Sequence, residues 1–131
     1  MTKQISGLET LNQLLVEMNR DGGFSIVVLT DAQGLAIASA AREGMDADRQ
    51  SAVVAFIQKT AVQVVRQLGM GTTEEVSLQD EHGQHLVCRP FTVNDHELIL
   101  AVLVPDKNIP YRRVTNNAIA EIRRTWKQFW E

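Results

Sequence analysis

Apolar residues recur at the period of a helix in three separate stretches of this chain. In each stretch they fall every three or four positions, which places them on one side of a helix. The first stretch ends at the polar and glycine residues NRDGG, and the second ends at two glycines, as is typical of helix C-termini. The predicted helices run from Ile5 to Met18, from the N-cap Asp46 to about Leu68, and from about Tyr111 to Phe129.

Five shorter segments have the composition of β-strands, because they are rich in β-branched residues or alternate in polarity. The last three are joined by the short polar segments EHGQ and NDHE, so consecutive strands are expected to pair as antiparallel hairpins. Pro90 lacks a backbone N–H and favours a bulge in the fourth strand. The predicted strands run from Phe24 to Thr30, Leu35 to Ala40, Glu74 to Asp80, Gln84 to Val93 and Glu97 to Val104.

The segment Asp31-Ala32-Gln33-Gly34 lies between the first two strands. Aspartate at its first position and glycine at its fourth favour a type I turn followed by a residue of positive φ. A calcium loop needs carboxylates at alternate positions, and a phosphate loop needs further glycines and a lysine. The segment is therefore predicted to turn the chain and not to bind a ligand.

The first and last strands are apolar on both faces, which requires helices on both sides of the sheet. The third strand instead alternates Val76 and Leu78 with polar residues, as expected at a sheet edge. The free backbone groups of such an edge can pair with another chain. The prediction is a single domain over residues 1–131, of the α/β (α+β) class, with the element order α-β-β-α-β-β-β-α.

Composition excludes several classes of function. The chain of 131 residues suffices for one hydrophobic core, and its formal net charge of -3 argues against a nucleic-acid-binding protein. The longest apolar run, LILAVLVP, is too short to span a bilayer, and the N-terminus lacks the apolar segment of a secretory signal. The single cysteine, Cys88, suits a reducing compartment, so we expect a cytoplasmic protein without a membrane partner.

Catalytic and metal-binding motifs are absent from the sequence. The segment LGMGTTEE lacks the Gly-Lys-Ser/Thr of a phosphate-binding loop. His82, His85, Cys88 and His96 lie near two turns, but His85 and Cys88 have opposite parity on a strand, and no Cys-x-x-Cys or His-x-x-x-His pair is present. We therefore predict a protein that is not an enzyme and has neither a cofactor nor a bound metal.

The middle helix has two unlike faces. The apolar arc expected to cover the sheet comprises Val53, Val54, Ile57, Ala61, Val64, Val65 and Leu68. The opposite arc mixes apolar and small residues with polar groups, which favours an interface, with burial under neighbouring loops as the alternative. The predicted interface comprises Ala52, Ala55, Phe56, Lys59, Val62, Gln63 and Arg66, with Glu75 and Ser77 from the third strand.

The last helix combines an aromatic and aliphatic stripe, predicted to be core, with a basic arc on its other side. Charged arcs usually only solvate a helix, but this one can also attract an acidic partner through an interaction that salt weakens. The basic arc comprises Arg112, Arg113, Arg123, Arg124 and Lys127.

The stretch VVLTDAQGLAIASA precedes a long Ala/Val-rich helix and the segments EEVSLQDEHGQHLVCRPF and HELILAVLVP, and together they resemble the roadblock/dynein light-chain domain over nearly the whole chain. The terminal helix, YRRVTNNAIAEIRRTWKQFW, is most similar to stand-alone prokaryotic MglB-like members. The resemblance implies a five-stranded antiparallel sheet with the middle helix on one face and the terminal helices on the other, a roadblock/profilin-like three-layer sandwich. It also implies homodimers joined through their middle helices and third strands, which bind and regulate Ras-like GTPases or act as scaffold subunits.

Three hypotheses of function result. The leading one is a non-enzymatic homodimer that regulates a Ras-like small GTPase, stimulating GTP hydrolysis by selecting a competent switch conformation or by inserting an arginine, for which Arg66 is the candidate on the interface arc. A scaffold or adaptor subunit would bind its partner without an effect on GTP turnover. A PAS-like sensor would hold a small molecule between sheet and helix, although the apolar strands offer few polar groups to orient it.

Overall fold

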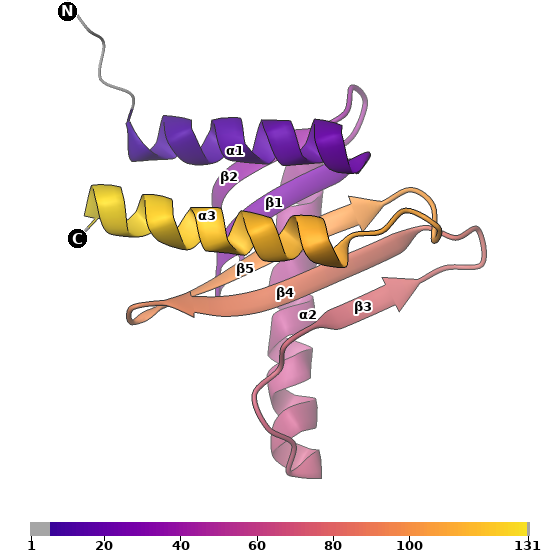
Figure 1. Cartoon of the computed structure of the whole chain (residues 1–131). Coiled ribbons are helices and arrows are strands. Elements are labelled where there is room, and N and C mark those ends of the chain that lie inside the picture. The colour runs from indigo at the N-terminus through magenta and orange to yellow at the C-terminus, as the bar shows by residue number, and fades with distance from the viewer. Residues whose placement is uncertain (1–5, 131) are drawn as a thin grey trace, which may run out of the picture.

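The computed structural model describes residues 6–130, which form an antiparallel sheet of five strands between two helical layers. The strand order is β2-β1-β5-β4-β3, with α1 and α3 side by side on one face and α2 across the other (Figure 1). The order of elements and the helices on both faces confirm the prediction. The elements are α1 (Gly7–Gly22), β1 (Ile26–Asp31), β2 (Ala36–Ala41), α2 (Ala47–Leu68), β3 (Val76–Gln79), β4 (His85–Val93), β5 (His96–Val104) and α3 (Arg112–Trp130).

Capping residues fix the ends of the first two helices. The carboxylate of Asp46 accepts the Arg49 N–H at 3.0 Å, which confirms the predicted N-cap of α2. Gly23, with a φ of 72°, ends α1 by donating its N–H to the Arg20 carbonyl. The helix therefore includes most of NRDGG and ends at Gly22 instead of Met18, whereas its predicted start at Ile5 lies outside the described residues.

Pro90 acts on the sheet differently from the prediction. β4 pairs with β5 in an unbroken register from His85 to Val93, so the predicted bulge is wrong. β3 is also shorter than predicted and pairs with β4 over Val76–Gln79. Continuing its register would place Glu74 opposite Pro90, which has no N–H to donate. Pro90 thus explains why the β3–β4 ladder ends where it does.

The predicted turn after β1 is confirmed in detail. The Gly34 N–H donates to the Asp31 carbonyl at 3.1 Å, and Gly34 has a φ of 85°. The Asp31 carboxylate accepts the N–H groups of Gln33 and Leu35, each at 2.9 Å. Because these bonds lie within the turn, the acidic group serves the local backbone.

The sheet separates two cores of unequal size. The larger core lies towards α1 and α3 and contains Leu15, Leu100 and Ile122. On the α2 side, Val54 is the buried apolar residue of the helix, and it packs with residues such as Val28 and Ile99. The predicted sheet-covering arc of α2 is wrong at Val53, Val64 and Leu68, which are 43%, 45% and 71% exposed. No helix within residues 6–130 is both long and apolar enough to cross a membrane.

Candidate interaction surface on α2 and β3

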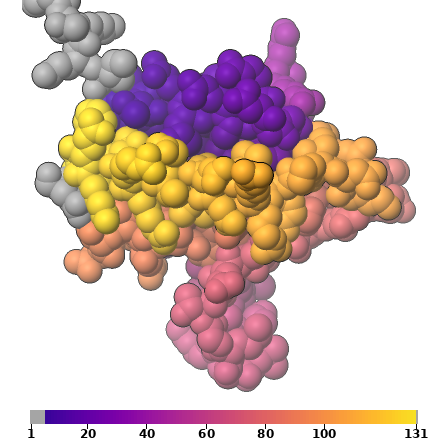
Figure 2. Space-filling model, viewed as in Figure 1, coloured from indigo at the N-terminus to yellow at the C-terminus, as the bar shows by residue number. Residues whose placement is uncertain are grey.

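The C-terminal half of α2 extends past the β3 edge of the sheet. Figure 2 shows it standing out from the body of the molecule, together with the segment that leads to β3. Its exposed apolar side chains include Val62, Val64 and Leu68, with Met70 just beyond the helix, whereas Phe56, 72% exposed, lies in the N-terminal half of α2. Several large apolar side chains exposed on one element mark a site of protein–protein contact. We call Phe56, Val62, Val64, Leu68 and Met70 the α2 apolar surface.

Most of the predicted interface residues of α2 lie open to solvent, namely Ala52, Phe56, Lys59, Val62, Gln63 and Arg66. Ala55 is half-buried instead, because the β1–β2 turn lies against it. A Cβ built on Gly34 would come within 2.3 Å of the Ala55 Cβ. Ala55 therefore holds the turn of its own chain.

The outer edge of β3 has free backbone groups beside the α2 apolar surface. The Asp80 N–H donates to the Gln84 carbonyl at 3.0 Å, so the even-numbered residues of β3 direct their N–H and C=O towards β4. The odd-numbered residues Ser77 and Gln79 direct theirs outward, and both residues are exposed. Ser77, a predicted interface residue, is thus placed to pair with another strand.

Glu75 is committed to contacts within the chain. Its Oε2 accepts the Tyr111 hydroxyl at 2.8 Å, and its Oε1 lies 3.8 Å from the Arg112 Nη2. Burial, with the bond to Glu75 and the charge of that carboxylate, raises the pKa of Tyr111. This cluster connects the segment before β3 to the start of α3. Glu75 therefore stabilises the position of the β3 edge through contacts within the chain.

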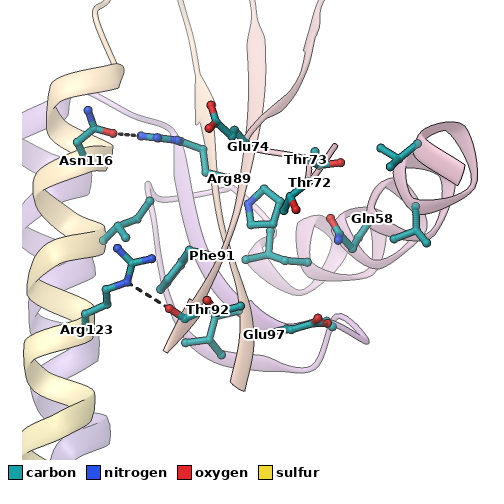
Figure 3. Close-up of a pocket in the computed structure, with 17 residues that line it drawn as sticks. Gln58, Thr72, Thr73, Glu74, Arg89, Phe91, Thr92, Glu97, Asn116 and Arg123 are labelled. Carbon is teal, nitrogen blue, oxygen red and sulfur yellow. Dashed lines mark hydrogen bonds between the residues drawn. The ribbon is translucent and has the colours of Figure 1, made fainter. Parts of the chain in front are cut away.

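A cavity of about 750 Å³ opens beside the part of β4 that β3 leaves unpaired (Figure 3). Its walls come from α2, from the segment before β3, from β4 and from α3. Arg89 reaches from β4 to Asn116 of α3, and Arg123 reaches back from α3 to Thr92. This cavity could not be predicted directly from the sequence, because it depends on the β3–β4 ladder ending at Val76 and Cys88. The signal available in the sequence was Pro90.

Known proteins are similar to this chain in sequence and in fold. Residues 10–103 match the sequence profile of the Roadblock/LC7 domain family. The chain belongs to this family. Two uncharacterised proteins of Methanocaldococcus jannaschii, MJ1340 and MJ0310, are each 30% identical to this roadblock domain over 112 residues, which cover 85% of this chain and 94% of theirs.

Solved structures show the same fold as this roadblock domain. Myxococcus xanthus MglB superposes with a TM-score of 0.78 at 14% identity, covering 100% of this chain and 98% of that chain. An MglB structure with a tetrameric arrangement superposes with a TM-score of 0.74 at 18% identity, covering 98% and 96%. At such identities the likeness extends to the fold alone.

The basic residues of α3 do not converge on one site in this roadblock domain. Arg112 lies near Glu75, and Arg123 donates its Nε–H to the Thr92 carbonyl at 3.2 Å, so both face the sheet. Arg113, Arg124 and Lys127 are exposed, and Arg124 pairs with Glu121 on the same helix at 2.6 Å. All five basic residues are exposed, and the attraction of an acidic partner by this arc stays a prediction.

The histidines and the cysteine considered as metal ligands are dispersed in the described structure. Within residues 6–130, no group of three or more His, Cys, Asp and Glu side chains is arranged to hold a metal ion. His85 lies edge-on to Tyr111 with 5.2 Å between ring centroids, and the His96 ring lies 5.3 Å from that of Trp126. Cys88 is 2% exposed in the core beneath α2, as predicted for a small buried cysteine.

The Cys88 thiol is expected to react slowly in the folded protein. Burial raises its pKa from 9.0 to about 12, so at pH 8 the thiolate fraction is about a thousandfold lower than for an ordinary cysteine. Alkylation at pH 8, followed by intact-mass spectrometry, should therefore be at least about 100-fold slower in buffer than in concentrated urea. Equal rates in both solvents would contradict the burial of this side chain.

Proposed function

We propose that this roadblock domain forms a homodimer through α2 and β3, and that the dimer binds and regulates a Ras-like small GTPase. The observation that carries the proposal is α2, which projects past an unpaired strand edge with its C-terminal half and has Phe56 72% exposed. One partner of suitable shape would cover both features together, because they lie next to each other at the same side of the molecule.

A second copy of the chain would be able to cover both features. If β3 pairs antiparallel with β3 of the copy, the two sheets join about a twofold axis, and every contact occurs twice. The end of each α2, which passes the β3 edge, then lies over the sheet of the other protomer. The tetrameric arrangement of an MglB with the same fold supports self-association as a property of this architecture.

The GTPase part of the proposal rests on the family. The resemblance to roadblock domains implies association with a Ras-like GTPase, and the sequence of this chain contains no phosphate-binding loop of its own. The proposed setting is the cytoplasm. Regulation is proposed to occur by selection of a GTPase switch conformation, since Arg66 lies on a rigid helix face and is poorly placed to act as a flexible finger.

The sensor alternative lacks support from the interior of the fold. Around Val54, the space between α2 and the sheet is filled by this residue, by the partly buried Ile57 and by strand residues such as Ile99. A ligand at that position would have to displace this core cluster. A scaffold function, by contrast, uses the same surface and differs from regulation in its dependence on nucleotide.

Binding to Ras-like GTPases of the source organism tests the proposal. Each GTPase is immobilised with GDP or with a non-hydrolysable GTP analogue, and titrated with the wild type, Phe56→Glu or Val16→Glu. We expect at least about tenfold tighter binding to one nucleotide state, because a regulator must distinguish the two switch conformations. Val16 is 52% exposed on α1, away from α2, so its variant should bind as the wild type does.

The outcomes separate the alternatives. Equal affinity for both nucleotide states, with unchanged GTP turnover, would favour the scaffold function. Absence of binding to every GTPase would refute a GTPase partner. The dimer would then be tested separately by its mass in light scattering. If Phe56→Glu and Val16→Glu lose binding equally, the loss is not specific to α2, and the proposed α2 interface would be rejected.

A further inference from the structure

Among residues 6–130, the sheet has three exposed stretches of strand edge. They are the outer side of β2, the outer side of β3, and the part of β4 beyond the end of β3. We propose that Asn12, Pro90 and Arg123 close the other edges and so restrict strand addition by a second copy to β3. This inference rests on the proposed dimer for its occupant, whereas the closure itself follows from the contacts below.

The backbone orientation of β4 defines which groups face outward. Pro90 sits in an unbroken ladder opposite Ile99 of β5 although it has no N–H, so its backbone groups face away from β5. Thr92 has the same orientation, and its carbonyl accepts a bond from Arg123, which lies outside the sheet. Beyond the end of β3, the outward positions are therefore Pro90 and Thr92.

These two positions offer an incoming strand half of the usual bonds. Pro90 supplies a carbonyl but no donor, and the Thr92 carbonyl is occupied by the Arg123 Nε–H at 3.2 Å. The Arg123 guanidinium is held in place by Phe91, whose ring centroid lies 5.5 Å from the guanidinium carbon. The Thr92 N–H and the Pro90 carbonyl remain, separated from each other along the edge. Proline and an inserted cation are established means of blocking an edge.

There is room for another strand at this edge. The edge is therefore closed by its lack of free hydrogen-bonding groups and not by steric obstruction. The cavity beside Pro90 and Thr92 has a volume of about 750 Å³ and is open to solvent (Figure 3). α3 is held along it by the Arg89 Nη1–H groups, which donate to the Thr115 Oγ1 at 2.8 Å and to the Asn116 Oδ1. Without Pro90 and Arg123, an extended segment would find both space and backbone partners here.

The opposite edge of the sheet is occupied at its centre by α1. This helix packs against β2, and the Asn12 Oδ1 accepts the outward N–H of Ser39 at 3.3 Å. On β3, in contrast, no hydrogen bond from a side chain within residues 6–130 reaches the backbone of Ser77 or Gln79. β3 is thus the edge at which a copy meets a complete set of donors and acceptors.

The test restores the missing donor and removes the cap. In Pro90→Val combined with Arg123→Ala, light scattering should give at least twice the wild-type mass at the same protein concentration. Amide hydrogen exchange of Thr92 should slow at least about tenfold, because its N–H becomes paired. The matched control is Pro110→Val with Arg124→Ala, which changes an exposed proline and an exposed arginine away from β4 and should behave as the wild type.

Each result decides the proposal. An unchanged mass together with unchanged exchange at Thr92 would overturn it, as would an equal rise in mass of the control. Arg123→Ala alone alters an exposed side chain and should shift mass and exchange in the same direction to a smaller extent. Slower exchange without a rise in mass would show that residues 72–75 of the same chain fill the opened edge, and would overturn the proposal that Pro90 and Arg123 exclude a second copy. A monomeric wild type would refute the proposed dimer, whereas the comparison of variant with wild type tests the closure in either case.

Discussion

Replacing Phe56 with glutamate is expected to convert a dimer of twice 14.6 kDa into a folded monomer of 14.6 kDa. A central aromatic residue typically contributes at least about 2 kcal/mol to an interface, and a twofold dimer contains it twice. The loss of about 4 kcal/mol corresponds to roughly a thousandfold weaker association. Light scattering over a range of protein concentrations measures the change directly.

Folding should survive this substitution, because Phe56 is 72% exposed and contributes little to its own core. Glutamate also has a favourable helix propensity, so the circular dichroism of the variant should match that of the wild type. Val16→Glu places the same charge on the exposed face of α1 and should remain dimeric. If Phe56→Glu keeps the wild-type mass, α2 is not the interface.

Gly34→Ala is expected to lower the free energy of unfolding by about 2–5 kcal/mol. Gly34 has a φ of 85°, which is unfavourable for alanine by about 1–2 kcal/mol. The added methyl would also lie 2.3 Å from the Ala55 Cβ and 3.1 Å from the Ser51 carbonyl oxygen, an overpacking that typically costs about 1–3 kcal/mol. Urea unfolding followed by circular dichroism measures the total.

Gly44→Ala separates the two causes. Gly44 also has a φ of 85°, but a methyl group there would meet nothing within 4 Å. The control should therefore lose only the conformational part, about 1–2 kcal/mol. Equal losses in the two variants would mean that the β1–β2 turn does not press against α2.

Local sequence signals accounted for the order of elements and for the turns. The Asp31 turn, the Asp46 cap and the glycine ends of the helices all depend on residues within a few positions of one another. The same chemistry recurs between β3 and β4, where the Asp80 carboxylate accepts the N–H of His82 at 2.9 Å and that of Gln84 at 2.8 Å. Such local bonds are readable from the sequence because no distant residue competes for them.

The surroundings of several residues depend on distant parts of the chain and could not be predicted from the sequence. Helical periodicity places Val64 and Leu68 on the side of Val54, but it does not show that the sheet ends before them. Ala55 is covered by a turn from another part of the chain, and Glu75 is bound by Tyr111, 36 positions away. Phe56 is exposed on the side of α2 opposite Val54, as periodicity indicates, while its place in an interface stays a prediction.

Gly7 packs against the Trp130 ring so closely that a Cβ at this position would lie 2.5 Å from its Cη2. The first turn of α1 and the last turn of α3 therefore leave the fold from one corner, well away from the end of α2 (Figure 1). An affinity tag, a fluorescent protein or a sensor-chip tether attached at either terminus thus anchors the molecule by that same corner. The projecting end of α2 is then left clear of the point of attachment.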